Sequence, residues 1–461
     1  MLTNLEIYRR ATTGEICTEK DFDLKRFVPA VRSLVKKYGI KYNPDTPVPS
    51  DDDLADRAWQ AGRELFLQTG VYCVDTERII RFEPIELDQA LAHTPRDVVV
   101  GFGEYVRHIP VRRPESSIPP FFSLGACGGP VSNDEVFMSL TQAYAELPYS
   151  DAVASPAMTH VDGLQIVAGS PLEIEGCIRT VRMTREATRR ANKFGLGIAN
   201  TVATGVRSQG HIAGNAVAAH PCDLMEIGHI ADLKTDFDGL SKIAYMQGQG
   251  RTILGGTGVV IGGYAGGPEG AAITLCAYHF FALLVQRASV VHPYMTHFRF
   301  QTTANRDVIW TRSLAAQAAT RHSNVPILES GVYSAGPATG LSLYEEAAMA
   351  AGCVVSGGSV EVGPTASATH PDYLSPMEPL FAAEVARSVV GMSRKDVNDL
   401  ILKLLAEYES FLENPPLGQR YQECFDMASR QPKTEALEHY TRARAAVREM
   451  GLEFKDPPYY A

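Results

Sequence analysis

Short apolar runs alternate with longer amphipathic stretches along most of the chain. Eight runs rich in apolar residues and glycine occur, at 121–127, 151–157, 196–200, 224–228, 252–261, 289–298, 327–332 and 360–363. Helical periodicity between them is clearest at 172–193, 270–288, 306–322 and 341–355. Apolar strands separated by helices are typical of a parallel sheet that is covered on both faces. Eight in one series predict an α/β protein with a closed (β/α)8 TIM barrel.

Two segments lie outside this series, and both have helical patterns. We expect residues 1–120 to form a helical N-terminal cap, with helices over 21–38 and 83–93, one starting after Ser50, and an irregular stretch over 94–120. The barrel is expected to occupy 121–395, ending with a helix at 379–390. Helices at 397–412 and 434–450 predict that 396–461 form C-terminal helices packed on the barrel.

An open doubly wound sheet is the rival fold, and it would need a glycine-rich phosphate loop. The candidate segments are 255–258 and 262–267. Neither matches G-x-G-x-x-G at the first strand-to-helix turn with an acidic residue about 20 positions later. The sequence therefore favours the barrel over a site for a dinucleotide or S-adenosylmethionine.

Composition and charge limit the classes of molecule that the protein is expected to bind. The 461 residues are 45% hydrophobic and 21% charged, with a formal net charge of −10. This balance disfavours nucleic acid and anionic membrane surfaces, which require a basic face, and it favours cationic substrates. We find no signal-peptide pattern and no run near the roughly 18 apolar residues of a membrane span, so we expect a cytoplasmic protein. The 8 cysteines are scattered without a CxxC pair, which indicates no disulfide framework.

Reactive groups in a barrel of this kind lie at the carboxyl ends of the strands. Glu226, in the fourth predicted strand, is the strongest candidate, because a carboxylate inside an apolar strand costs several kcal/mol unless it is paired. Other polar or aromatic groups near strand ends are His160, Asn200, Thr201, Tyr264, Glu329, Ser330 and Tyr333. His160 could equally support a neighbouring residue through a hydrogen bond or contact the ligand. The two tyrosines could equally pack in the core or form a wall of the substrate site.

A zinc site is an alternative, because His220, Cys222, Glu226 and His229 are close in sequence. Their spacing matches no established zinc pattern, and we predict no bound metal. A zinc-dependent methyltransferase acting on a methylated thiol or methoxy compound stays open as a second hypothesis.

Several segments carry a resemblance to a known family. They are 66–79, 261–267 (Ile-Gly-Gly-Tyr-Ala-Gly-Gly) and 418–426 (Gly-Gln-Arg-Tyr-Gln-Glu-Cys-Phe-Asp), with further likeness at 8–11, 17–18 and 23–24. Together they resemble the monomethylamine:corrinoid methyltransferases of methylotrophic methanogens, in order and at matching spacing. The resemblance implies a (β/α)8 barrel, a homo-oligomer, and methyl transfer to the cob(I)alamin of a separate corrinoid protein that docks over the barrel mouth. It implies no cofactor bound tightly by this chain.

This chain differs from the family at the position of the family's reactive residue. Archaeal members place pyrrolysine after a Gly-x-Gly-hydrophobic element, and here 195–198 match while the next residue is Ala199. Glu226 corresponds to a family carboxylate, whereas a second falls at Gly256 and a third near Thr201 or Val202. The family's Gln and Tyr correspond to Ser330 and Val332, and a one-residue slide brings in Tyr333 instead.

An alanine cannot supply the imine through which pyrrolysine is thought to capture an amine. A quaternary ammonium needs no such capture, because its nitrogen leaves as a neutral amine when cob(I)alamin attacks the methyl carbon in line. We therefore predict a methyltransferase acting on a small methylated amine, quaternary amines included, with Glu226 as the catalytic residue. The predicted substrate-binding residues are His160, Ala199, Asn200, Thr201, Tyr264, Glu329, Ser330 and Tyr333. A barrel that binds without turnover is the third hypothesis.

Overall fold

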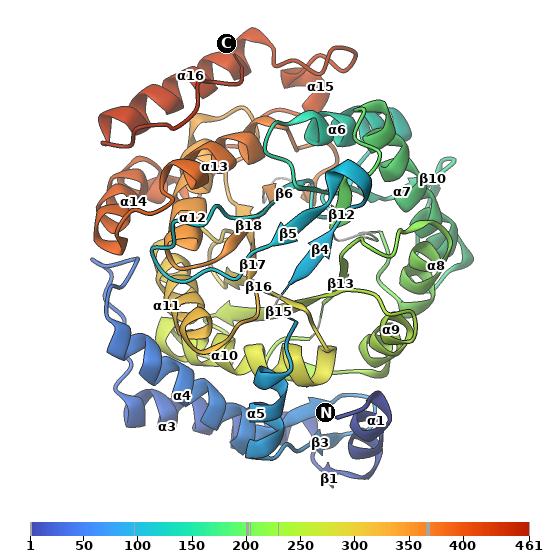
Figure 1. Cartoon of the computed structure of the whole chain (residues 1–461), viewed down its shortest axis with the longest axis vertical. Helices are drawn as coiled ribbons and strands as arrows, with labels where there is room; N and C mark the ends of the chain where they lie inside the picture. Colours follow the sequence, from blue (N-terminus) through green and yellow to red (C-terminus); the bar gives the residue numbers. More distant parts are fainter. Residues whose placement is uncertain are drawn as a thin grey trace.

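Eight parallel strands form a closed ring in the computed structural model (Figure 1), which describes residues 2–95, 97–199, 202, 204–228, 230–365 and 369–460. One ladder runs in the order β12 (Gly197–Ala199), β8 (Ala152–Ala154), β6 (Phe122–Gly125), β18 (Ser359–Thr365) and β17 (Leu328–Tyr333). A second joins β13 (Met225–Ile227), β15 (Ile253–Ile261) and β16 (Val290–His297). The bridge Val291–Ile327 and the hydrogen bond from Leu224 N to Ile198 O close the ring. The (β/α)8 barrel is confirmed.

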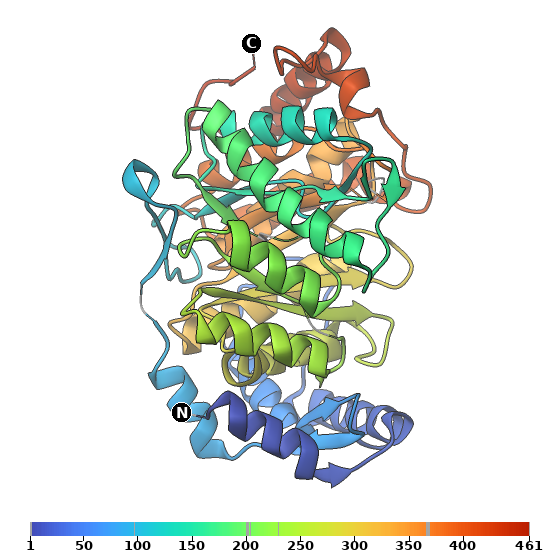
Figure 2. The same cartoon turned by 90° about the vertical axis from the view of Figure 1, so that its right-hand side faces the viewer.

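Helices alternate with these strands and cover the outside of the barrel (Figures 1 and 2). In chain order they are α6 (Asp134–Glu146), α7 (Pro171–Arg190), α8 (Ser208–Ala218), α9 (Phe237–Gly248), α10 (Pro268–Phe281), α11 (Arg306–His322), α12 (Gly340–Val355) and α13 (Met377–Ser388). A π-helical segment, η3 (Ala282–Gln286), continues α10. Strand residues such as Leu124, Val153 and Ile198 pack outward into one of the cores beneath these helices.

A β-hairpin closes the end of the barrel where the strands begin. It is formed by β4 (Val98–Val100) and β5 (Arg107–Ile109), within a stretch that was predicted to be irregular. Val98, Val100 and Ile109 pack against inward-facing residues of the strands, which include Ala199, Leu224, Leu254, Val290 and Leu328. Figure 2 shows this hairpin at the end of the barrel opposite to the strand tips. We call this apolar cluster the floor, and the opposite end the mouth.

The N-terminal part contains helices and, unlike the prediction, a small sheet. The helices are α1 (Asn4–Thr13), α2 (Glu19–Asp21), the π-helical η1 (Phe22–Phe27), α3 (Val28–Tyr38), α4 (Asp52–Thr69) and α5 (Pro84–Ala92). The sheet combines β1 (Glu15–Ile16), β3 (Arg78–Ile80) and β2 (Val71–Cys73) with β14 (Lys234–Thr235), which comes from the loop after β13. Helix α4 packs on α10 and α11. Its N-cap is Asp51, which accepts a hydrogen bond from Leu54 N, rather than Ser50.

The C-terminal part adds α14 (Arg394–Tyr408), the 3-10 turn η5 (Glu409–Phe411), α15 (Tyr421–Cys424) and α16 (Thr434–Glu449). Helices α14 and α16 pack on α12, on the side of the barrel away from the N-terminal part (Figures 1 and 2). Short elements complete the described chain: η2 (Gly103–Tyr105), β7 (Pro130–Val131), β9 (Ala157–Met158), β10 (His160–Val161) and β11 (Leu164–Gln165).

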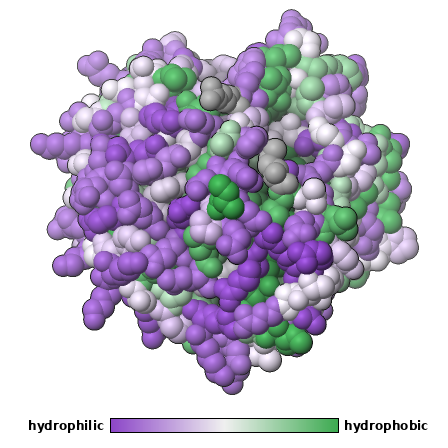
Figure 3. Space-filling model, turned by 60° about the horizontal axis from the view of Figure 1, so that its bottom comes forward, coloured by the Kyte–Doolittle hydropathy of each residue, from purple (hydrophilic) through white to green (hydrophobic). Residues whose placement is uncertain are grey.

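One helical stretch among the described residues, Pro268–Gln286, is long and apolar enough to cross a membrane by those criteria alone, contrary to our expectation that no run approaches that length. Its most apolar window is 89% buried inside the fold, where it packs against α4. The face drawn in Figure 3 is mostly hydrophilic, and its apolar side chains gather in separate patches.

Candidate active site

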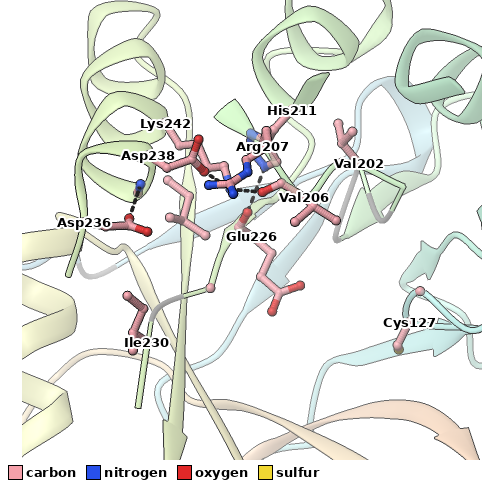
Figure 4. A pocket seen from close by; sticks show the side chains of 15 residues that line it. Cys127, Val202, Val206, Arg207, His211, Glu226, Ile230, Asp236, Asp238 and Lys242 are labelled. Atoms are coloured by element: carbon pink, nitrogen blue, oxygen red, sulfur yellow. Dashed lines mark hydrogen bonds and ion pairs between the residues drawn. The ribbon is translucent and has the colours of Figure 1, made fainter. Parts of the chain in front are cut away.

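A cavity of about 730 Å³ opens at the barrel mouth, beside the carboxyl ends of β12 and β13 (Figure 4). We call it the mouth cavity. Its charged lining includes Glu226, Asp236, Asp238, Lys242 and Arg207, which come from β13, α8 and α9 and the loops that flank them. Loops at this end of a barrel are where enzymes of this fold place their reactive groups, so the cavity is the candidate active site.

Glu226 projects into the mouth cavity from the middle of β13. Leu224 belongs to the floor and Met225 and Ile227 pack under the helices, so strand alternation turns Glu226 to the barrel interior. Its carboxylate points into the space between Ile230 and Cys127 (Figure 4), and the side chain is 23% exposed. A Cβ atom at Gly256 would lie 3.0 Å from Glu226 Oε1, so the glycine leaves room for this carboxylate.

Two further ionisable groups lie inside the barrel beside Glu226. The Nε2 atom of His292, on β16, is 3.8 Å from Glu226 Oε1 and 3.1 Å from Glu361 Oε2, on β18. The Nδ1 atom of His292 is 2.7 Å from the carbonyl oxygen of Leu328, and Ser123 Oγ donates to Glu361 Oε1 at 3.1 Å. We call Glu226, His292 and Glu361 the interior charge cluster.

The electrostatics of this cluster favour a charged histidine. Burial alone would lower the pKa of His292, but the carboxylates of Glu361 and Glu226 outweigh burial and raise it to about 9. Burial raises the pKa of Glu226, with a further increase from Glu361, while His292 opposes the change. At neutral pH the cluster therefore holds an imidazolium between two carboxyl groups.

A second histidine forms a hydrogen bond to the backbone of the strand that lines the mouth cavity. His211, on α8, is buried, and its Nε2 is 3.0 Å from the backbone oxygen of Glu226. Burial, reinforced by Lys242, lowers the pKa of His211 to about 4, so the ring is neutral and Nε2–H donates. Asn215 Nδ2 lies 3.3 Å from His211 Nδ1, which fits this tautomer. His211 thus fixes the backbone that carries Glu226.

Cys127 and Tyr294 stand close to the charge cluster. Cys127 follows β6, lines the mouth cavity and donates its thiol hydrogen to Val362 O at 2.8 Å. Burial, with smaller contributions from Glu361 and Glu226, raises the pKa of this thiol well above its ordinary value. Tyr294 follows His292 by two residues on β16, is 40% exposed, and its pKa is raised by burial and by Glu226. Both side chains are therefore neutral near pH 7.

Several predicted binding residues lie elsewhere. His160 is exposed on the β10–β11 hairpin, where its Nδ1 is 3.0 Å from Thr159 Oγ1. Tyr264 lies on the surface after β15, beneath Lys234 Nζ at 5.7 Å from the ring centroid. Neither lines the mouth cavity. Asn200 and Thr201 fall outside the described residues, so their predicted roles stay predictions.

The residues predicted from β17 face two ways. Glu329 turns outward and forms a buried ion pair with Arg312 of α11 at 2.8 Å, and Tyr333 is buried in the core under the helices. We correct their assignment to packing, because these side chains face away from the barrel interior. Ser330 faces inward, since it alternates with Glu329 and pairs in register with Glu361. Ala199 also faces inward, as part of the floor.

The described part of the proposed zinc set does not assemble. His220 stacks on Phe102 beside the floor hairpin, with ring centroids 4.1 Å apart, and its Nδ1 accepts a hydrogen bond from Cys222 N. His229 lies outside the described residues. Across those residues, no group of three or more His, Cys, Asp or Glu side chains is arranged to hold a metal ion.

Sequence reasoning missed His292, Glu361, His211 and Tyr294. Three of them carried a usable signal, because Glu361 interrupts an apolar strand just as Glu226 does, and His292 and Tyr294 share one face by strand alternation. His211 lies on a helix that the pattern did not predict, so it had no local signal.

Comparison with known proteins agrees with this architecture. Residues 2–452 match the family model described as monomethylamine methyltransferase MtmB. The chain is 30% identical to monomethylamine methyltransferase MtmB2 of Methanosarcina barkeri and 31% identical to MtmB1 of Methanosarcina acetivorans, each over 97% of this chain and 98% of the relative. The crystal structure of the Methanosarcina barkeri enzyme superposes with a TM-score of 0.95 at 29% identity, covering 98% of both chains. The chain therefore belongs to the monomethylamine methyltransferase (MtmB) family of enzymes.

Proposed function

We propose that this enzyme takes a methyl group from a small methylated amine, quaternary amines included, and transfers it to the cob(I)alamin of a separate corrinoid protein. The observation that carries the proposal is the carboxylate of Glu226, which is partly exposed inside the mouth cavity and receives no hydrogen bond from the described residues. Its nearest cation, His292, is 3.8 Å away and lies closer to Glu361, so a methylated ammonium ion in the cavity would offset the cost of keeping this carboxylate charged there.

The reaction requires little from the protein beyond positioning the methyl donor. The C–N bond breaks with its electron pair staying on nitrogen, and the new bond to the methyl carbon forms with an electron pair from cobalt. A quaternary nitrogen then leaves as a neutral tertiary amine and needs no proton. Holding the methyl carbon in line with the cobalt supplies most of the rate enhancement, so Glu226 serves to bind and orient the cation.

The proposal includes activity without pyrrolysine. Ala199 occupies the position that the family resemblance assigns to that residue, and its side chain is buried in the apolar floor. A carboxylate at position 256, where the family has one, would crowd Glu226, because even a Cβ atom there lies 3.0 Å from Glu226 Oε1. These two small residues support a site rebuilt around one carboxylate and a bulkier cation.

Exposed apolar side chains near the mouth support a docking role for that end of the barrel. Val206, Ile230, Phe298 and Tyr264 follow four of the barrel strands and are 63%, 38%, 80% and 45% exposed. Apolar side chains around a recessed reactive group are typical of a surface that a protein partner covers. A corrinoid domain seated there would bring its cobalt over the mouth cavity.

The test is methyl transfer by the full-length protein to reduced cobalamin, with and without the corrinoid protein, from a panel of primary to quaternary methylated amines. We expect methylcobalamin to form from at least one cationic amine. We also expect Glu226→Gln to lower kcat/KM by on the order of tenfold to a hundredfold, since it removes a charged contact.

No transfer from any amine, with intact folding of the protein, would refute the proposal. Transfer from a methylated thiol or methoxy compound that depends on added zinc would favour the second hypothesis from the sequence instead.

A further inference from the structure

The interior charge cluster contains more charged groups than binding of a methylated amine requires, because Glu226 alone would serve for binding. Glu361 is 1% exposed and His292 is 2% exposed, so both lie below the mouth cavity rather than in it. A buried ion pair contributes little net stability. The pair therefore needs an explanation other than stability.

Geometry alone fixes most of the proton positions. His292 Nδ1 lies 2.7 Å from a backbone carbonyl oxygen, which can only accept, so Nδ1 carries a hydrogen. His292 Nε2 faces carboxylate oxygens of Glu361 at 3.1 Å and of Glu226 at 3.8 Å. The other oxygen of Glu361 already accepts from Ser123 Oγ. A histidine that donates at both nitrogens is an imidazolium, and its nearer partner is Glu361.

We propose that Glu361 is a specificity-determining positioning residue. By pairing with the positive charge of His292, it leaves Glu226 without a counterion of its own, so that the cationic donor supplies the opposite charge. Two carboxylates and one imidazolium leave one net negative charge, which selects a monocationic methyl donor over neutral donors such as methanol or methoxy compounds. This inference rests on the proposed function for its donor class, but its tests do not require methyl transfer.

Other groups near the cluster leave this balance unchanged. The nearest titratable side chains are Cys127 after β6, Tyr294 on β16 and, on the outer face of β17, Glu329. Among the described residues, the remaining charged side chains of the mouth cavity are two cations and two anions, which balance one another: Arg207, Lys242, Asp236 and Asp238. Cys127 and Tyr294 are neutral, because burial raises the pKa of each. Glu329 and Arg312 form their own ion pair on the outer face of the barrel.

The decisive experiment measures binding of tetramethylammonium, a quaternary cation with no other functional group, by titration calorimetry. In Glu361→Gln, the imidazolium of His292 turns to Glu226 and cancels its charge. We expect binding near pH 7 to weaken at least tenfold and to recover as the pH is raised and His292 loses its proton. Loss of Glu361 also lowers the pKa of His292, so recovery should begin at a lower pH in the variant, whereas wild-type binding should stay nearly constant up to about pH 8, below the pKa of about 9 of its His292.

The double variant Glu361→Gln/His292→Gln gives the sharpest contrast. It leaves Glu226 alone with its single negative charge, so binding should return to within about threefold of wild type. A merely structural role for Glu361 predicts the opposite, because a second buried substitution would only add damage. Glu345→Gln is the matched control, since Glu345 is an equally buried, hydrogen-bonded glutamate on α12 with no histidine partner among the described residues, and it should leave binding unchanged.

A measurement on the wild type covers the case in which the variants fold poorly. Nitrogen NMR of ring-labelled histidine should show His292 with both nitrogens protonated at pH 7.5. A neutral His292, equal binding by wild type and Glu361→Gln at every pH, or no binding of tetramethylammonium by the wild type would each overturn the inference. Methyl transfer to cobalamin judges the proposed function separately.

Discussion

At the residue scale, the direction in which β16 turns its side chains places an aromatic ring near Glu226, next to the residues that line the mouth cavity. His292 and Tyr294 alternate with Val291, which packs outward, so both face the barrel interior. Tyr294 is the exposed one of the pair, and its phenol lies close enough to Glu226 for the carboxylate to raise its pKa, after burial. An aromatic face beside a carboxylate is a favourable place for a quaternary ammonium ion.

Replacing Tyr294 tests this placement. We expect Tyr294→Leu to weaken tetramethylammonium binding about fivefold, since a cation–π contact contributes on the order of 1 kcal/mol. Tyr294→Phe keeps the ring and should bind within twofold of wild type. Titration calorimetry on both variants measures the effect, and equal binding by the leucine and phenylalanine variants would exclude a cation–π role.

His211 gives a prediction about pH and stability. Its folded-state pKa, lowered to about 4 by burial and by Lys242, lies below the ordinary value of 6.5. As the pH falls below about 6.5, His211 binds a proton in the unfolded chain but stays neutral in the folded chain. This histidine therefore lowers the stability of the fold progressively toward pH 4. Above about pH 6.5 the effect is absent.

The variant His211→Gln removes that titration. The difference in unfolding free energy between wild type and variant should therefore shrink by about 2 kcal/mol between pH 8 and pH 5. Urea unfolding at both pH values provides the measurement. A difference that is the same at the two pH values would show that His211 is protonated in the folded protein.

Single residues differ in how far sequence alone predicted them. Glu226 was identified because a lone carboxylate in an apolar strand demands an explanation, and it lies in the mouth cavity. Its partners His292 and Glu361 come from strands 66 and 135 residues further along the chain, so only the closed ring brings them together. Glu329 and Tyr333 were assigned to the wrong face, because the register of β17 decides which of its residues turn inward, and the pattern left that register open.

At the element scale, the ion pair between Arg312 and Glu329 ties helix α11 to strand β17. Both side chains are buried, and Arg312 Nε lies 2.8 Å from Glu329 Oε2. Removing one member of such a pair leaves an uncompensated charge in the core, which costs about 3–5 kcal/mol.

We therefore expect Arg312→Met to lower the unfolding free energy by about that amount. The double variant Arg312→Met/Glu329→Gln should regain at least half of the loss, because no charge then stays buried alone. Denaturant midpoints of the two variants check this, and a double variant less stable than the single one would contradict it.

Elements with strong periodic patterns were the ones that sequence predicted well. Helix α11 spans Arg306–His322, the predicted 306–322, and all eight barrel strands lie within or beside the predicted runs. Helices α6, α8 and α9 were not predicted, and α8 has the weakest amphipathic pattern of the three, with Gly210, His211, Gly214 and Asn215 on its buried face. The floor hairpin and the sheet with β14 depend on pairing between distant segments, which local pattern does not reveal.

At the scale of the whole molecule, the two ends of the barrel have different roles. The floor is sealed by the β4–β5 hairpin, and the N- and C-terminal parts flank the barrel on opposite sides (Figures 1 and 2). The mouth keeps its cavity open, with exposed apolar side chains around it. A partner protein therefore has one end of the barrel through which it can reach Glu226.

Docking at the mouth predicts a selective effect of Phe298, which is 80% exposed just after β16. We expect Phe298→Asp to raise the KM for the corrinoid protein at least tenfold, as for a central interface residue, and to leave tetramethylammonium binding unchanged. Phe194→Asp is the control, because Phe194 is 51% exposed but precedes β12 at the floor end. Equal effects of the two substitutions would argue against docking at the mouth.

A crystal structure of the protein with bound tetramethylammonium tests the central claim most directly. The account predicts the cation in the mouth cavity, with its nitrogen within about 6 Å of both the Glu226 carboxylate and the Tyr294 ring, and one methyl group directed out of the mouth. A cation bound elsewhere, or a Glu226 side chain turned away from an empty cavity at saturating cation, would contradict it.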